Sequence, residues 1–294
     1  ATLAATNDVT SSVQIRADGV SVSDLNLTAP LGGKRYGTYD QHKLFVAANN
    51  VTLSGITITG SAAAGVFLLG ANNFRLDNIT VRDSRADGIH MSDGSSNGVV
   101  NNAVTERTGD DGVAVVSYSE RFHPSVTRMC RNIVINNPVV NGTTFGRGVA
   151  VVGGENVTYR NINVSRTSGA GVYVSTEGAP FFTQSTTGVQ ILGGSVTGAG
   201  WTPGLAMGAL AVYGEHGGYS TTNVTFADLV IANTNREAQR NIRISTKDGG
   251  AVNNVAFRNI SISQQGDLET IYSNVPPGSY TLSDVTLNGA PVTT

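Results

Sequence analysis

A short motif that returns at a nearly constant interval constrains the fold of this chain more than any other feature of its sequence. Its two clearest copies are NVTLSGITI, which starts at Asn50, and NFRLDNITV, which starts 23 positions later at Asn73. The same frame returns at Asn97, Asn132, Asn156, Gly188, Asn223 and Asn254, and more faintly at Gly19. Repeats of this length are typical of solenoids, which stack one structural unit on the next. Longer intervals between some copies indicate loops inserted into single coils, which a solenoid tolerates because each repeat contacts only its neighbours.

Apolar residues alternate with polar ones inside each copy, as at Val51 and Leu53, and this period of two predicts strands rather than helices. Each coil also carries a second apolar run that opens with glycine, as in Gly88-Ile-His-Met and Gly112-Val-Ala-Val-Val. We therefore predict three short strands per coil and about nine coils. The predicted fold is all-β: a single right-handed parallel β-helix domain over residues 1–294.

Asparagine dominates the first position of the motif, and a second column contains Asn78, Asn102, Asn137, Asn161, Asp228 and Asn259. Asparagine tolerates the left-handed backbone conformation of a tight turn, and its amide can bond the equivalent amide one coil away. We interpret both columns as structural ladders. The glycosylation sequons at Asn50 and Asn156 fall in the first column, so we interpret them as ladder positions too.

Composition limits the partners. Charged residues make up only 14% of the chain, the formal net charge is -2 and no run of Lys or Arg occurs, so we expect no nucleic-acid partner. Apolar runs fall far short of the roughly 20 residues that span a bilayer, so we expect no membrane partner. The single Cys130 has no partner for an intrachain disulfide, and we expect it to be a buried core residue. The composition and the start at Ala1 lead us to expect a secreted protein, and we expect a monomer.

Acidic residues converge in two adjacent coils. The residue before the glycine that opens the second run is Ala64, Asp87, Asp111, Arg147 and Ala170 in successive coils, and Asp110 precedes Asp111. Because one coil of 24 residues separates them, the two aspartates of this column should lie about 5 Å apart, one strand spacing, with Asp110 beside them. Three carboxylates so close repel one another and raise at least one pKa, which costs stability without a structural benefit.

Such a cluster suits glycoside hydrolysis, which needs one protonated carboxyl group and one ionised carboxylate. His90 and Arg147 would border the cluster, where they could hold substrate or tune the acids. Strand alternation points His90 outward and Asp87 inward, so both face a groove only if Asp87 lies in the bend before the strand. Two alternatives remain open, because Asp-Gly is a common turn signal and clustered carboxylates also suit calcium. We predict no metal and no cofactor.

In these acidic motifs the sequence resembles the polysaccharide hydrolases of the pectin-lyase-like β-helix superfamily. The motifs are Asp87-Gly88 and, one coil later, Gly109-Asp110-Asp111. Polygalacturonases and the α-1,3-glucanase (mycodextranase) family carry this pattern, and both are inverting hydrolases. The resemblance therefore implies catalysis by the three aspartates. The polygalacturonase pattern further implies that Asp110 is the acid and that Asp87 and Asp111 activate water.

The resemblance to polygalacturonases stops beyond the triad. Their next two coils carry Gly-His-Gly and Arg-Ile-Lys, which hold the uronate carboxylate. This chain has Gly146-Arg-Gly and Gly171-Val-Tyr-Val instead. Arg243-Ile-Ser falls three coils past Gly148, too far along the axis to replace them. The α-1,3-glucanase family, whose spacing between the first aspartate and the pair also agrees, is the closer match.

Enlarged coils place loops at about 28–45, 118–130, 177–187, 198–207, 213–221 and 232–240, and these loops hold many aromatic residues. Aromatic faces stack on sugar rings, so such loops could form walls of a groove, although they could equally pack on the solenoid. We predict that substrate is bound by His90, Arg147, Tyr118, His123, Tyr173 and Trp201.

The leading hypothesis is therefore an endo-acting, inverting hydrolase of a neutral polysaccharide, with α-1,3-glucan the first candidate. Other polysaccharide hydrolases, including polygalacturonases, and a calcium-dependent polysaccharide lyase are alternative enzymes. A glycan-binding solenoid without turnover is the alternative outside catalysis.

Overall fold

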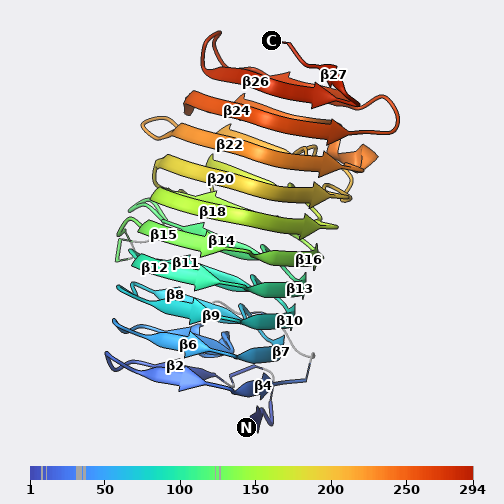
Figure 1. Ribbon diagram of the computed structural model, residues 1–294. Helices are drawn as coiled ribbons and strands as arrows, with labels where there is room; N and C mark the ends of the chain where they lie inside the picture. Colours follow the sequence, from blue (N-terminus) through green and yellow to red (C-terminus); the bar gives the residue numbers. More distant parts are fainter. Residues whose placement is uncertain are drawn as a thin grey trace.

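The computed structural model describes residues 1–7, 9–10, 12–30, 35, 38–122, 124–125 and 127–293. The chain winds into a stack of coils, with its two termini at opposite ends of the stack (Figure 1). All strand pairs between coils are parallel, and one antiparallel pair, β26 with β27, closes the last coil. The predicted right-handed parallel β-helix is confirmed.

Two sheets run along the stack. The first contains β1 (Thr2–Ala4), β3 (Ser21–Ser23), β4 (Asn26–Thr28), β6 (Thr52–Ser54), β7 (Thr57–Ser61), β9 (Arg75–Asp77), β10 (Thr80–Ser84), β12 (Ser96–Asn101), β13 (Val104–Thr108), β15 (Arg131–Asn136), β16 (Val139–Thr143), β18 (Gly154–Ser165), β20 (Thr186–Thr197), β22 (Ser220–Ala232), β24 (Ala251–Ser263), β26 (Tyr280–Leu287) and β27 (Ala290–Pro291). The second contains β2 (Val13–Ile15), β5 (Leu44–Val46), β8 (Val66–Leu69), β11 (Ile89–Ser92), β14 (Val113–Val116), β17 (Val149–Val152), β19 (Val172–Thr176), β21 (Leu210–Gly214), β23 (Arg240–Thr246) and β25 (Glu269–Ser273). Two short 3-10 helices, η1 (Tyr39–Gln41) and η2 (Arg236–Ala238), interrupt loops.

Three strands per coil, as predicted, occur in the N-terminal half, where β6, β7 and β8 make up one coil. Toward the C-terminus the first two strands merge into single long strands such as β18 and β22. Within the described residues the second sheet has ten strands, one more than the predicted number of coils. The count from the motif started at Gly19 and therefore missed β2, which precedes it.

The core lies between the sheets and is continuous from Ile15 to Val285. In each coil every second residue of a strand points inward and is buried. The parallel register stacks apolar residues of neighbouring coils on one another, as where Ile89 pairs with Val113 and Val113 with Val149. Cys130 is buried in this core, as predicted, with its thiol near two backbone carbonyls. Neither helix of the described chain is long and apolar enough to cross a membrane.

The asparagine ladders are confirmed. Every first-column position from Gly19 to Asn254 has a positive φ, and so do the second-column positions. The Asn73 amide donates to the Asn50 side chain at 2.7 Å, and the Asn156 amide donates to that of Asn132 at 3.3 Å, so both sequon asparagines belong to the ladder. These turns pin the register of one coil on the next.

Candidate active site

The coil register brings the acidic residues together. Gly88 donates its backbone N–H to the carbonyl of Asp111 at 2.9 Å, and Gly112 donates to the carbonyl of Arg147 at the same distance. Asp87, Asp111 and Arg147 therefore lie in one column across three adjacent coils, each just before a strand of the second sheet. Asp87 lies in the bend before β11, outside the strand alternation, and so both it and His90 face the groove.

Side chains of this column bond the backbone of the next coil. Asp87 Oδ1 accepts the N–H of Asp111 at 2.9 Å, and Asp111 Oδ1 accepts the N–H of Arg147 at 2.7 Å. His42 makes the same kind of bond two coils earlier, because its Nδ1 accepts the N–H of Ala64 at 3.2 Å. These bonds fix one atom of each side chain and so orient the other atoms toward the groove.

His42 thus belongs to the column but was missed from sequence. The sequence pattern identifies a member of the column by the glycine that follows it, so the predicted column begins at Ala64. His42 is followed by Lys43 and not by glycine, and the pattern therefore does not include it. The strand register does identify His42. Leu44 opens β5 and pairs with Val66, which opens β8, so the residues two positions before them, His42 and Ala64, are equivalent. Burial, together with the nearby His90, lowers the pKa of His42 to about 3, so its imidazole is neutral.

The three carboxylates are close enough to interact strongly. Asp87, Asp110 and Asp111 each offer an oxygen within 4.8 Å of the other two. This limit applies to one oxygen of each group, and it is shorter than the roughly 6.5–9.5 Å that separates the two carboxyl groups of inverting glycosidases.

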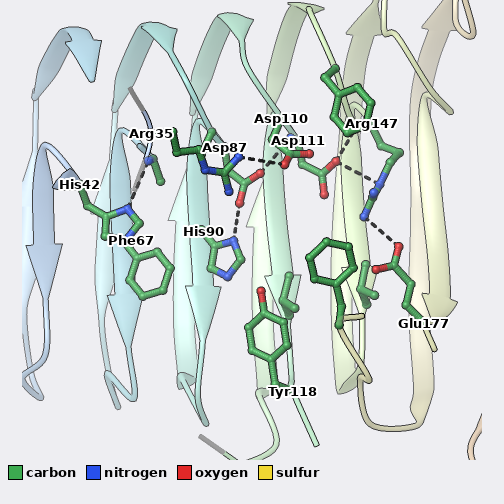
Figure 2. A pocket seen from close by; sticks show the side chains of 16 residues that line it. Arg35, His42, Phe67, Asp87, His90, Asp110, Asp111, Tyr118, Arg147 and Glu177 are labelled. Atoms are coloured by element: carbon green, nitrogen blue, oxygen red, sulfur yellow. Dashed lines mark hydrogen bonds and ion pairs between the residues drawn. The ribbon is translucent and has the colours of Figure 1, made fainter. Parts of the chain in front are cut away.

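A cavity of about 630 Å³ opens beside this cluster. Figure 2 shows the carboxylates along one side of it, with His42 and Phe67 in earlier coils, His90 in the coil of Asp87 and Glu177 in a later coil. Its lining consists of Arg35, His42, Ala64, Phe67, Ala86, Asp87, His90, Asp110, Asp111, Val116, Tyr118, Phe145, Arg147, Val152, Glu177 and Phe181.

His90 and Asp87 form a buried pair. The Nδ1 atom of His90 makes a short hydrogen bond to Asp87 Oδ2 (Figure 2). Burial alone would raise the pKa of Asp87, but the charge and hydrogen bond of His90 outweigh it, so the pKa lies below its usual value. The other ring nitrogen of His90, Nε2, is buried and has no hydrogen-bond partner among the described residues. His90 therefore lines the cavity with other atoms of its side chain.

The pKa values of the other two carboxyl groups, Asp110 and Asp111, are raised instead of lowered. Burial, with the nearby charge of Asp87, raises the pKa of Asp110. Burial raises the pKa of Asp111 well above its usual value, against the opposing effect of Arg147. The cluster therefore combines an ionised carboxylate with neighbours that keep their protons to higher pH, which is the division that acid and base catalysis requires.

Arg147 closes one end of the cluster. Its Nε lies 3.0 Å from Asp111 Oδ1, without the alignment of a hydrogen bond, and a terminal nitrogen lies 3.4 Å from Glu177. Its guanidinium group also packs over the ring of Tyr173, 4.5 Å from the centroid. Arg147 is therefore held from three sides, and both carboxylates neutralise its charge.

The six predicted substrate-binding residues have four different outcomes, of which the last, that of Trp201, is described separately below. His90, Arg147 and Tyr118 line the cavity with the carboxylates. Tyr173 is buried beneath Arg147 and lines a smaller neighbouring cavity, so its support of the site is indirect. His123 lies outside the described residues.

The prediction for Trp201 differs from the structure. Its side chain is exposed but does not line the cavity. The loop that carries it leads into β21, three coils beyond β14, and three strand spacings place it about 14 Å along the axis from the carboxylates.

Several lining residues were not predicted as site residues: Arg35, His42, Phe67, Phe145, Glu177 and Phe181. Phe181 belongs to a loop that sequence did mark as aromatic. No sequence signal marked Phe145 or Glu177, because they lie in turns between strands, where side-chain direction follows no fixed period.

With this geometry established, residues 16–187 match the family described as the right-handed β-helix region. The chain belongs to this family. It has no significant match among curated proteins.

Solved structures share the fold at low sequence identity. A GH87 α-1,3-glucanase catalytic domain in complex with tetrasaccharides is 17% identical with a TM-score of 0.68, over 97% of this chain and 58% of that one. An alginate lyase from Paenibacillus sp. is 16% identical with a TM-score of 0.59, over 98% and 88%. PfbA, a surface adhesin of Streptococcus pneumoniae, is 14% identical with a TM-score of 0.65, over 94% and 70%. The fold is thus shared by a hydrolase, a lyase and an adhesin, and the argument for function must come from the site.

Proposed function

We propose that this protein is a glycoside hydrolase that cleaves a neutral polysaccharide within the chain, with α-1,3-glucan as the first candidate. One observation carries the proposal: three carboxylates with opposed pKa shifts meet at the side of a cleft. A turn-forming role accounts for any one of these aspartates, but not for their convergence.

In the proposed reaction Asp110 is the general acid. It is the most exposed of the three, so its proton can reach the leaving glycosidic oxygen as the C–O bond breaks. Asp87 and Asp111 each have Oδ1 fixed by a backbone N–H, and Oδ2 of Asp87 is also bonded to His90. The Oδ2 atoms of the two carboxylates orient a water molecule. That water attacks the anomeric carbon and gives its proton to the ionised carboxylate.

The charges around the cleft favour a neutral substrate. Of the described lining residues, Arg35 and Arg147 are the two with a guanidinium group, and each has a carboxylate partner, Asp110 for the first and Asp111 with Glu177 for the second. While Asp110 holds the proton that it needs as the acid, Glu177 is still the partner of Arg147, so a uronate would have to compete with Glu177 for that guanidinium group. This supports a neutral glucan over a polygalacturonate.

The stereochemical course is a separate part of the proposal. Inversion rests on the family resemblance, whereas the short spacing of the nearest oxygens favours retention. Proton NMR of the first sugar product distinguishes the two, because the anomer released by inversion differs from that of the substrate.

Release of reducing ends from a panel of α-glucans, β-glucans and polygalacturonate tests the activity. We expect Asp110→Asn to lower kcat by about 100-fold or more, as removal of a general acid does. Asp83→Asn is a matched control, because Asp83 pairs with Arg107 away from the cavity and asparagine tolerates its positive φ. Full activity of both Asp110→Asn and Asp111→Asn on every glucan that the unsubstituted protein cleaves would refute the proposal.

A further inference from the structure

Two phenylalanine rings at the cavity remain exposed although their backbones are firmly held. Phe145 is 58% exposed and Phe181 is 50% exposed, and both line the cavity with the carboxylates. Exposed apolar side chains that gather at a cleft mark binding surfaces more often than isolated ones do.

We propose that Phe145 and Phe181 form a subsite for the ring of a neutral pyranose sugar, next to the carboxylate cluster. This inference rests on the proposed function, since it names the sugar surface that the same cleft recognises. Neither ring takes part in the chemistry, and the two act on binding and specificity.

The two rings come from opposite edges of the second sheet. Phe145 precedes β17 and Phe181 follows β19, and these neighbouring strands are parallel. Phe145 therefore lies at the edge that carries the carboxylates, and Phe181 lies at the far edge. Both belong to coils on the C-terminal side of β14, so the proposed subsite extends from the cluster in that direction.

The turn that carries Phe145 is fixed on both sides. The neighbouring Thr144 donates its N–H to the carbonyl of Thr108 at 2.7 Å, and Gly169 donates to the carbonyl of Gly146 at the same distance. Gly146 has a positive φ, and a Cβ there would lie 2.4 Å from the Asp110 carboxylate. The turn is thus packed directly against the proposed acid.

The loop that carries Phe181 is fixed to a different loop. Ser119 donates its N–H to the carbonyl of Phe182 at 2.8 Å, and the Gln184 amide donates to the carbonyl of Tyr118 at 3.0 Å. Gly178 further donates to the Glu215 carboxylate at 2.8 Å. Such anchoring keeps the loop ordered before a ligand arrives, which reduces the entropy lost on binding.

Between the rings the floor of the groove is apolar. Val116 and Val152 line the cavity and belong to a buried cluster with the small side chains of Ala114 and Ala150. A pyranose ring presents C–H groups on its faces and hydroxyls at its edge. The rings and floor suit those faces, while the carboxylates at one side suit the hydroxyls.

Binding of soluble tetrasaccharides tests the inference without requiring turnover. The probes are an α-1,3-linked glucotetraose and a tetragalacturonate, titrated calorimetrically into the Asp110→Asn protein. We expect Phe145→Ala and Phe181→Ala, each added to that background, to raise the Kd for glucotetraose about tenfold, and Phe→Tyr at either position to retain binding. Val230→Ala is the control, because Val230 is also 50% exposed but lies on β22 of the other sheet.

The outcomes separate this inference from the proposed function. Weakened glucotetraose binding in the alanine variants supports the subsite even if the unsubstituted protein releases no reducing ends, a result that refutes hydrolysis alone. Three results would contradict the proposed subsite. They are an unchanged Kd for glucotetraose in both alanine variants, tighter binding of tetragalacturonate than of glucotetraose, and no binding of either probe by the Asp110→Asn protein.

Discussion

His90 distinguishes Asp87 from the other two carboxylates at the scale of single residues. Asp87 and Asp111 are buried and Asp110 is half-buried, and burial by itself raises the pKa of each carboxyl group. Only Asp87 has a short bond to an imidazole, and its pKa is lowered instead. The hydrogen bond to His90 thus gives Asp87 a lower pKa than the other two carboxyl groups, and this difference separates the proposed base from the proposed acid.

This division predicts the pH profile of kcat/KM. Activity should be present between the lowered pKa of Asp87 and the raised pKa of Asp110, and be lost as pH falls through the first or rises through the second. His90→Phe removes the partner that lowers the pKa of Asp87, so the acidic limb should move to higher pH.

The stability of the same variant provides the control. The His90 ring stacks on Phe67 at 4.8 Å and 6°, and Phe67 stacks on Phe45, so phenylalanine at position 90 extends an existing stack. The stack is kept, but Asp87 loses the partner that offsets its burial, so we expect the melting temperature to fall at neutral pH. An acidic limb that stays in place in the folded variant would show that His90 does not tune Asp87.

At the scale of elements, the turn between two strands depends on asparagine for two separate reasons. Asn102 has a φ of 53°, donates to Asn78 at 3.1 Å and accepts from Asn137 at 3.0 Å. Its backbone conformation is unfavourable for most residues, and its side chain links three coils.

Two substitutions separate these reasons. Asn102→Gly accommodates the conformation but loses the ladder bonds, which should cost about 1 kcal/mol of unfolding free energy. Asn102→Ala loses both and should cost about 1–2 kcal/mol more. Chemical denaturation measures the two values, and equal losses would mean that the backbone conformation contributes nothing.

At the scale of the whole molecule, one continuous core supports a groove along the outer face of the second sheet. Any such solenoid can display a lyase site, a hydrolase site or a binding surface, because the stacking of coils places few demands on outward residues. The carboxylate cluster at this groove could hold a hard cation as well as perform acid and base catalysis.

A chelator distinguishes these uses of the cluster. We expect the release of reducing ends to persist after dialysis against EDTA, and the products to lack ultraviolet absorbance, because hydrolysis by carboxylates requires no calcium and leaves no double bond. Loss of activity on chelation, restored by added calcium and accompanied by an absorbing product, would favour the lyase.

The sequence by itself determined the features that repeat: the coil period, the ladder positions and the column that brings Asp87, Asp111 and Arg147 together. Parallel stacking maps a fixed interval in sequence onto a fixed distance in space, so periodicity was sufficient to predict them. The orientation of Asp87 before its strand was undecided from sequence, because strand alternation does not extend into a bend.

Only the tertiary structure decided what surrounds the cluster. Phe145, Glu177 and Phe181 reach the cavity from turns and loops of unequal length, whereas Trp201, from a loop of similar composition, does not. A loop residue has no repeating neighbour to fix its direction, so its position follows from contacts distant in sequence, such as the bond from Ser119 to Phe182.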